Sequence, residues 1–432
     1  MSDDAAWMEE IIDAGTARVD ELEVYLGRVR GISVDLKGPV TGVAEEDRSC
    51  GYSIRVIDGG RIGASSSSDP DRWRECLDAA CAGARLSPPQ AWDGLPDPAL
   101  LRRDVPSADP GLEVTPEGVA DLVGALQEGA ARHPEATVAG GGAHLTRGTA
   151  LLANSAGVLY TREFTRAGVS LEAIVGESTG HEFDASVCAG DIDPGRVGER
   201  AAELAVVSAK GADIATGTAD IILSPTAAAQ FLSNVVIPAL SGRNVHAGRS
   251  ALAEKLGEEC MDPRLSLTDD PFARGLSSTA WDAEGVPTAP LTLVEEGVLR
   301  SFAYDLKTAY RYGEESTASA VRAGSGGSPA IGVHNLVVDG PRGAVDDDPA
   351  VYIHDVVGAH TANPLTGDFS VECANPLRVA GGSVEEPVRG AMLSGNIFSM
   401  LSEIAALGSE SRVVGSTILP AIRFNTQRII GK

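Results

Sequence analysis

The chain has 432 residues, with 61 acidic against 35 basic side chains and a formal net charge of −26. This length exceeds the usual size of one hydrophobic core and predicts two or three domains. The negative charge would repel a phosphate backbone, so we expect no direct nucleic-acid binding. The acidic N-terminus is unlike an export signal, and the apolar runs are too short for a membrane span.

The six cysteines form no CxxC motif and no dense framework, which is typical of reduced thiols. These features together predict a cytoplasmic protein without a membrane association. The acidic, lysine-poor composition fits either a salty cytoplasm, where ions screen the self-repulsion, or an acidic proteome in general. Both interpretations stay open.

Residues 1–86 are expected to form a first α+β domain. An amphipathic helix near Trp7 begins it, and strand-like segments follow. A second helix is predicted from its cap Asp69 and from Pro70 in its first turn. Residues 87–114 are rich in proline, which predicts a stiff connector.

Residues 115–215 are expected to form a second α+β domain with the same order of elements. Thr115 and Pro116 begin a helix, alternating segments follow, and Asp193 with Pro194 begins another helix. The repeated order would fit an ancient duplication, but the order of elements alone is weak evidence without residue identity between the halves.

Residues 216–432 consist mostly of short alternating segments separated by turn residues, which predicts a β-rich C-terminal domain. One helix is expected from Ser224 to near Pro238, where proline must end or kink it. Another is expected from its cap Asn396 to Gly408. The predicted fold class is therefore α+β, with two N-terminal helix–strands–helix parts followed by a β-rich domain.

Four segments of the C-terminal domain carry a resemblance to a known family: DAEGVP (282–287), GVLRSFAYDLKTA (297–309), EST (315–317) and NPLTGDFS (363–370). They closely resemble the TldD/PmbA family of metallopeptidase-related proteins, also described as peptidase U62-like. The resemblance spans nearly the whole chain and implies the fold of that family.

In the catalytic branch of the family, a helix carries a His-Glu-x-x-x-His motif that binds zinc and activates a water, and a later cysteine completes the ligands. The matching positions here are Ser233, Asn234, Pro238 and Val414. Hydroxyl and amide groups are poor zinc ligands, and proline and valine offer none. The resemblance therefore implies the non-catalytic TldE/PmbA branch, with no metal or catalytic residue in this chain and with zinc in a partner subunit.

The implied function is that of a non-catalytic subunit in a cytoplasmic TldD/TldE-type metallopeptidase complex. Its partners would be a TldD-type catalytic subunit, in a heterodimer, and an unfolded or short peptide, which binds by adding a strand to an exposed sheet edge. We expect the contact surface at the loop Ala323–Pro329 and at a set of turn residues: His360, Gly367, Asp368, Phe369, Ser370, Ser394, Gly395 and Asn396. The alternative is that these residues only hold the turns of the β core.

Two other functions stay open. One is a self-contained hydrolase built from His354, His360 and nearby carboxylates. The other is a protein-binding regulator of the type described as a modulator of DNA gyrase. Neither the pair His181 and Glu182 nor His246 has the partners of a metal site, so we interpret the pair as a surface dipeptide and His246 as a polar interface residue.

The glycine-rich stretch Ala323–Pro329 lacks the lysine and the strand-to-helix setting of a phosphate-binding loop. Two interpretations remain for it. It is either a flexible loop beside a substrate groove or an ordinary linker.

Overall fold

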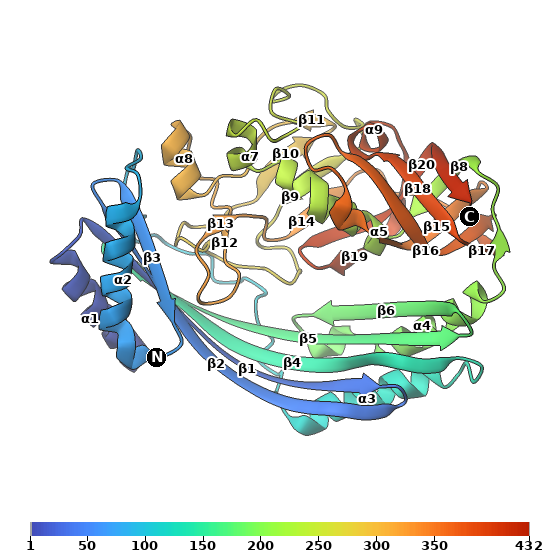
Figure 1. Ribbon diagram of the computed structural model, residues 1–432, viewed down its shortest axis with the longest axis horizontal. Helices are drawn as coiled ribbons and strands as arrows, with labels where there is room; N and C mark the ends of the chain where they lie inside the picture. The colour runs from blue at the N-terminus through green and yellow to red at the C-terminus, as the bar shows by residue number, and fades with distance from the viewer. Residues whose placement is uncertain (1, 432) are drawn as a thin grey trace.

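The computed structural model describes residues 2–431, which fold into an N-terminal part (2–211) and a C-terminal part (212–431) (Figure 1). The N-terminal part is built on one antiparallel sheet of six strands in the order β3-β2-β1-β4-β5-β6. Its strands are β1 (Glu21–Lys37), β2 (Val40–Asp58), β3 (Arg61–Ser67), β4 (Thr137–Asn154), β5 (Leu159–Val175) and β6 (Ser178–Ser186).

Helices cover one face of this sheet (Figure 1). They are α1 (Ser2–Thr16), η1 (Pro70–Arg72), α2 (Trp73–Leu86), α3 (Pro116–Ala130), η2 (Ala189–Asp191) and α4 (Pro194–Ser208). Leu22 and Leu26 of β1 pack with α1 and α2, and Ile32 and Val34 of the same strand pack with α3 and α4. Because alternate residues of a strand share a face, the odd-numbered Glu23 and its neighbours face the other side, towards the C-terminal part.

The first and the second predicted α+β domains meet at the centre of this sheet. Strand β1 pairs with β4 along most of its length, from Glu23 opposite Asn154 to Lys37 opposite Gly140. Each domain contributes three strands to the sheet. The two helix–strands–helix parts therefore share one continuous sheet.

The C-terminal part contains a second, twelve-stranded sheet, with the order β11-β10-β9-β14-β20-β8-β15-β16-β17-β7 and with β18 and β19 attached to β20. Its strands are β7 (Ala212–Asp213), β8 (Gly217–Leu223), β9 (Ser266–Asp269), β10 (Leu291–Glu295), β11 (Val298–Leu299), β14 (Leu336–Asp339), β15 (Ala350–Val357), β16 (Asp368–Ala380), β17 (Ser383–Arg389), β18 (Ala391–Asn396), β19 (Ile404–Val414) and β20 (Thr417–Gly431). A separate hairpin pairs β12 (Ala320–Val321) with β13 (Ala330–Ile331).

The helices of the C-terminal part are short. They are α5 (Pro225–Phe231), the π-helical turn η3 (Leu232–Val236), α6 (Ile237–Ala239), α7 (Gly242–His246), α8 (Leu306–Tyr312), η4 (Ala359–Thr361) and α9 (Ile397–Leu401). This arrangement confirms the α+β class with a β-rich C-terminal part. Across residues 2–431, no helix combines the length and the apolar character needed to cross a bilayer.

The prediction of one long helix from Asn396 to Gly408 is wrong beyond its first turn. Asn396 does cap α9, but the helix ends at Leu401 and strand β19 begins at Ile404. Ile404 lies opposite Phe424 of β20, and both side chains are buried in the C-terminal core. Pairing with the last strand of the chain therefore overrides the local helical spacing.

Candidate functional site

The helix that resembles the zinc-binding helix of the family is interrupted by its π-helical turn. Ser224 caps it, with its Oγ accepting a hydrogen bond from the backbone N–H of Ala227 at 3.1 Å. In η3 the N–H of Ile237 donates to the carbonyl of Leu232, five residues back. Pro238 has no N–H to continue the ladder, and the helix ends one residue later, as the sequence predicts.

The four residues at the metal-ligand positions do not fit a zinc ion. Ser233 is exposed, and the amide nitrogen of Asn234 donates to the carbonyl of Gln230 at 2.8 Å. Pro238 has no donor atom, and Val414 packs against the C-terminal core. Zinc sites in proteins use imidazole, thiolate and carboxylate ligands, which this set lacks. Within residues 2–431 we find no group of three or more His, Cys, Asp or Glu that could hold a metal ion.

A pocket of about 350 Å³ lies beside Pro238. Its apolar wall consists of Ile237, Pro238, Leu240, Ala330, Ile331 and Val333, and Arg243, Asn244 and Arg249 add polar groups. Strand β13 borders this pocket and pairs only with β12 in the described chain, so its other edge has no strand partner. An apolar pocket next to an unpaired edge suits an extended peptide that adds a strand.

The glycine-rich stretch Ala323–Pro329 forms the turn of the β12–β13 hairpin, and its tip rests on the N-terminal sheet. Gly27 and Gly51 lie opposite each other on β1 and β2, and they form a notch for Ser325. A Cβ atom on Gly27 would lie 2.8 Å from the Cβ of Ser325, closer than real Cβ contacts allow. Ser325 therefore packs against the N-terminal sheet, while Ala323, Gly324, Gly326 and Ser328 are exposed.

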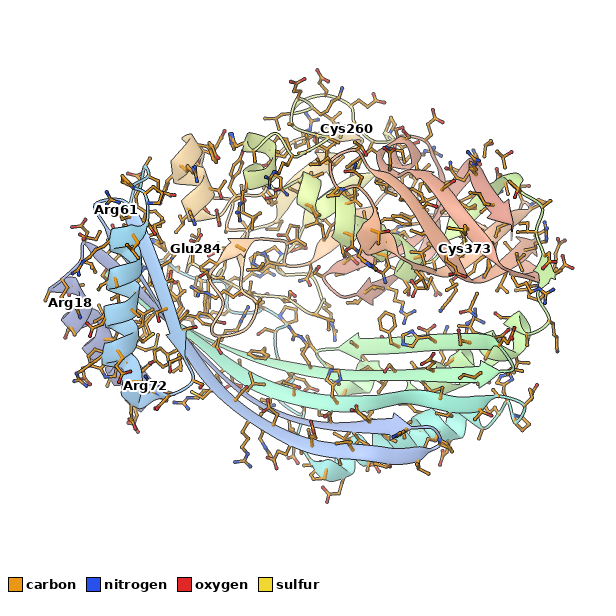
Figure 2. All side chains as sticks on the ribbon, viewed as in Figure 1. Arg18, Arg61, Arg72, Cys260, Glu284 and Cys373 are labelled. Atoms are coloured by element: carbon orange, nitrogen blue, oxygen red, sulfur yellow. The ribbon has the colours of Figure 1, made fainter. Side chains whose placement is uncertain are left out.

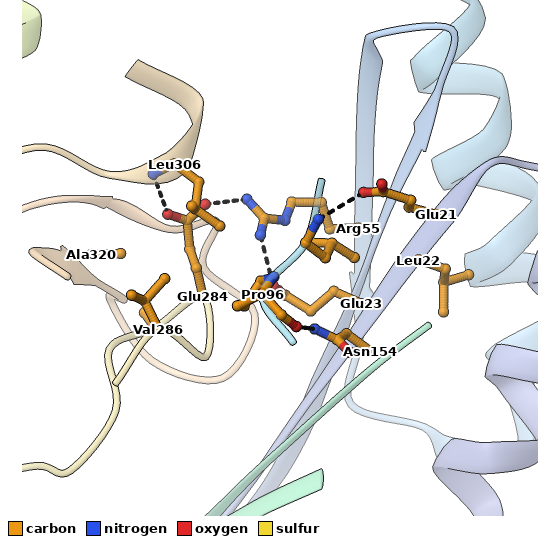
Figure 3. A network of polar contacts seen from close by, with 12 residues as sticks. Glu21, Leu22, Glu23, Arg55, Pro96, Asn154, Glu284, Val286, Leu306 and Ala320 are labelled. Carbon is orange, nitrogen blue, oxygen red and sulfur yellow. Dashed lines mark hydrogen bonds and ion pairs between the residues drawn. The ribbon is translucent and has the colours of Figure 1, made fainter. Parts of the chain in front are cut away.

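A buried network of four charges lies next to this hairpin, and Figure 3 labels three of its members, Glu23, Arg55 and Glu284. Arg55 of β2 contacts Glu284 and also donates to Glu23 of β1 at 2.7 Å, and Arg322 contacts the same Glu23. All four side chains are at most 5% exposed. Burial opposes the charge of Arg55, but Glu23 and Glu284 outweigh it and raise its pKa. Glu284 lies where the N-terminal sheet meets the C-terminal part (Figure 2) and also accepts a hydrogen bond from the N–H of Leu306 at 2.7 Å.

The segment DAEGVP positions both this network and the hairpin. The Oδ1 of Asp282 accepts hydrogen bonds from the N–H groups of Glu284 and Val286, each at 2.9 Å. Its Oδ2 accepts one from the N–H of Ala320 in β12 at 3.1 Å. Burial, together with repulsion from Glu284, raises the pKa of Asp282 to about 8.

The structure brings the two segments of predicted turn contacts together, because Asp368 lies opposite Asn396 and Ser370 opposite Ser394 in the β16–β18 pair. The Nδ2 of Asn396 donates to Oδ1 of Asp368 at 2.8 Å, while its Oδ1 caps α9. Gly395 lies between them, opposite Phe369.

Two of these residues serve the turn and the core. Gly367 has a φ of +85°, and a Cβ there would lie 2.5 Å from the ring of Phe398. Phe369 is buried, with its ring 4.6 Å from that of Phe231, so it faces the core and not a contact surface. Contact with a peptide or a partner at the exposed Asp368 and Ser370 stays a prediction.

The structure does not assemble a site from His354 and His360. His354 is buried in β15, with Nε2 3.6 Å from a carboxylate oxygen of Glu182, while His360 is exposed in η4. The interpretation of Glu182 as a surface residue is wrong, because Arg412 of β19 pairs with it at 2.7 Å and makes its burial possible. His181 is exposed, as expected.

Glu182 and His354 lie on the wall of a cleft of about 960 Å³ between the two parts of the chain. Burial lowers the pKa of His354, although Glu182 opposes the shift. The Nε2 of this buried histidine lies 3.2 Å from the carbonyl oxygen of His181, so His354 contributes to the structure of this wall.

His246 is held by aromatic neighbours. Its ring stacks on Tyr312 at 4.0 Å, and its Nε2 lies 3.2 Å from the hydroxyl of Tyr304. Both the ring and its Nε2 therefore have neighbours within the C-terminal part.

Sequence reasoning missed two arginines, Arg162 and Arg166, that line a small pocket between the sheet and the C-terminal part. The available signal is their spacing. They alternate with Phe164 in a segment of strand, which places all three on one face.

Comparison with known proteins gives a consistent result along the chain. Models for the PmbA/TldA metallopeptidase family match residues 22–84 (domain 1), 109–209 (central domain) and 216–431 (C-terminal domain). An uncharacterized protein of Methanocaldococcus jannaschii is 30% identical over 98% of this chain and 99% of its own length. The metalloprotease PmbA of Escherichia coli O157:H7 is 25% identical over 96% of this chain and 94% of its own.

Among solved structures, that of TldE from Thermococcus kodakarensis superposes with a TM-score of 0.90 at 27% identity. The match covers 98% of this chain and 100% of the other.

Proposed function

Because this chain belongs to the PmbA/TldD metallopeptidase family, we propose that it is the non-catalytic subunit of a TldD/TldE-type metallopeptidase complex. In this proposal a TldD-type partner supplies the zinc ion and the catalytic groups. The chain described here supplies part of the enclosure around an unfolded or short peptide, in the cytoplasm.

The observation that carries the proposal is the set of side chains on the helix and strand that resemble the metal site. Ser233, Asn234, Pro238 and Val414 offer no imidazole, thiolate or carboxylate. The remaining motifs of the family are present, from Asp282 to Ser370. A family member that lacks only the metal ligands fits a subunit whose surfaces still enclose the peptide.

The pocket beside Pro238 supports a role as a wall for the substrate. The pocket has a volume of about 350 Å³ and an apolar lining, and the unpaired edge of β13 borders it. Such a wall needs shape and backbone hydrogen-bonding groups, and both are available without a metal. The structural likeness to TldE agrees with this assignment.

The proposal is tested by purifying the chain alone and together with a TldD-type subunit from the same cell. Elemental analysis should find no stoichiometric zinc in the isolated chain, and unstructured peptides should stay uncut by it. The mixture should form a defined complex with peptidase activity. Chelator-sensitive cleavage by the isolated chain, or a partner that is fully active without binding it, would contradict the proposal.

A further inference from the structure

A pocket of about 150 Å³ lies between strand β5 and the loops that precede the β12–β13 hairpin. Arg162 and Arg166 of β5 form one wall, and Tyr25, Ser277, Trp281 and His334 are among the residues that complete it. The two arginines are four residues apart on one strand, so they project from the same face of the sheet. This face is the one turned towards the C-terminal part.

The two guanidinium groups have no carboxylate partner within ion-pair distance in residues 2–431. The Nε of Arg162 is inaccessible to solvent and has no hydrogen-bond partner. Arg166 donates one hydrogen bond, to the carbonyl of Thr165 at 2.6 Å. Burial lowers the pKa of Arg162, which Tyr25 partly offsets, and burial with repulsion from Arg162 lowers the pKa of Arg166 to about 10.

The two buried arginines Arg55 and Arg423 of this acid-rich chain are both paired. Arg55 contacts Glu23 and Glu284, and Arg423 lies 2.9 Å from Asp220. An enclosed charge without a counterion destabilises a fold by several kcal/mol. In a chain with a net charge of −26, two neighbouring arginines that line one pocket without a carboxylate partner in the described chain are a feature that a ligand would explain.

Aromatic rings hold these two side chains in place. The guanidinium of Arg162 lies 5.5 Å from the ring centre of Trp281, and that of Arg166 lies 5.9 Å from that of Phe164. Contact with a ring orients a guanidinium without neutralising it. Asp282, on the same pocket wall, uses its carboxylate to accept backbone hydrogen bonds from Glu284, Val286 and Ala320.

We propose that this pocket binds a small oxyanion, a carboxylate or phosphate group, between Arg162 and Arg166. A volume of 150 Å³ corresponds to roughly five water molecules, which is enough for such a group. The planar fork of a guanidinium matches the two oxygens of a carboxylate or phosphate. If the proposed function holds, the carboxylate of a peptide is the source, and this identification rests on that function. The anion site itself does not.

The test measures the melting temperature of the full chain in glutarate or inorganic phosphate, against sodium chloride of equal ionic strength. Both anions should raise the melting temperature in a concentration-dependent manner. Calorimetry should show that Arg162→Met and Arg166→Met each weaken binding about tenfold or more. Without added anion, Arg162→Met should melt no lower than the unaltered chain, since it removes an unpaired charge.

Arg102→Met is the matched control. Arg102 also lies over an aromatic ring, that of Phe272, but it is exposed and paired with Asp104. Its replacement should leave anion binding unchanged. Arg162→Lys, which keeps the charge, should retain part of the effect. If neither anion acts beyond chloride, or if both act equally on Arg162→Met, the site does not exist.

Two peptides identify the source of the oxyanion. A short neutral peptide with a free C-terminal carboxylate should compete with glutarate, whereas the same peptide with an amidated C-terminus should not. Competition by neither peptide, with phosphate still bound, would overturn the peptide source and assign the site to free phosphate. These results do not depend on whether the chain binds zinc or cleaves peptides, so failure of the proposed function would be seen separately.

Discussion

Arg55 of strand β2 and Glu284 of the C-terminal part form an ion pair that is buried at the junction of the two parts (Figure 3). Their side chains are 5% and 0% exposed. Glu23 and Arg322 complete a set of two acids and two bases, so the charges balance inside the protein. Because all four side chains are at most 5% exposed, each charge depends on the others, and the network links the C-terminal loops to the sheet.

Glu284→Gln should destabilise the chain strongly. The substitution leaves Arg55 with one carboxylate in place of two, and breaking a buried pair costs about 3–5 kcal/mol. The melting temperature should fall by several degrees. Glu75→Gln, which removes a partner of Arg72 at the surface, should leave it unchanged. Equal melting temperatures for the two variants would show that the network contributes little.

Asp282 should make stability depend on pH. Its pKa of about 8 is above the value of about 4 for an unfolded aspartate, so the folded chain binds a proton more tightly. The stabilisation is therefore present below about pH 4 and is lost as the pH rises towards 8. Melting temperatures measured from about pH 5 to about pH 9 should fall, and Asp282→Asn should flatten that slope.

Two features of the pH experiment distinguish Asp282 from other titrating groups. The amide introduced by Asp282→Asn would keep an oxygen for the N–H groups of Glu284 and Val286, so the turn has an acceptor in the variant. Asp104 is exposed, and a hydrogen bond from Arg102 lowers its pKa, so Asp104→Asn should leave the slope unchanged. An unaltered slope in Asp282→Asn would assign the pH dependence to other groups.

Gly27→Ala should loosen the tip of the β12–β13 hairpin. The new Cβ would meet the Cβ of Ser325 at 2.8 Å, and rotation of the serine cannot relieve that contact. A broad-specificity protease should then cut the segment Ala323–Pro329 faster, as mass spectrometry would show. The second substitution Ser325→Gly should restore resistance. Gly124→Ala, in helix α3 with open space around it, should have no effect on this cleavage.

Asp368→Ala and Ser233→Ala test whether the predicted turn residues form a contact surface or only hold the turns of the β core. In the complex with a TldD-type subunit, Ser233→Ala should leave peptide cleavage unchanged, since Ser233 is exposed and a hydroxyl is a poor zinc ligand. Asp368→Ala removes the partner of Asn396 and should weaken cleavage while the isolated chain stays folded. Equal rates with intact assembly would favour a role of Asp368 in the turn alone.

The local features of the fold could be predicted from the sequence. Thr115, Asp193 and Ser224 cap their helices with side-chain oxygens, each accepting a hydrogen bond from an N–H three residues on. Such caps depend only on near neighbours in the chain. The α+β class follows from the same signals.

The features that depend on distant residues could not be predicted. Nothing near Ile404 shows that it lies opposite Phe424, and nothing near Glu182 shows that Arg412, 230 residues away, will pair with it. At the candidate site, the residue types at positions 233, 234, 238 and 414 could be read directly from the sequence. The neighbours of Arg162 and Arg166 could not, because the pocket forms only when the C-terminal loops cover the sheet.

The pairing of β1 with β4 limits how the chain can be divided. A fragment that ended at residue 86 would keep β1 but expose its full edge, from Glu23 to Lys37, as unpaired backbone. Long bare edges of this kind recruit other strands and aggregate. The first two domains of this chain are therefore not independent modules. A truncated chain, a fusion protein or a chimera with a relative must therefore contain both domains, with the register of the β1–β4 pairing intact.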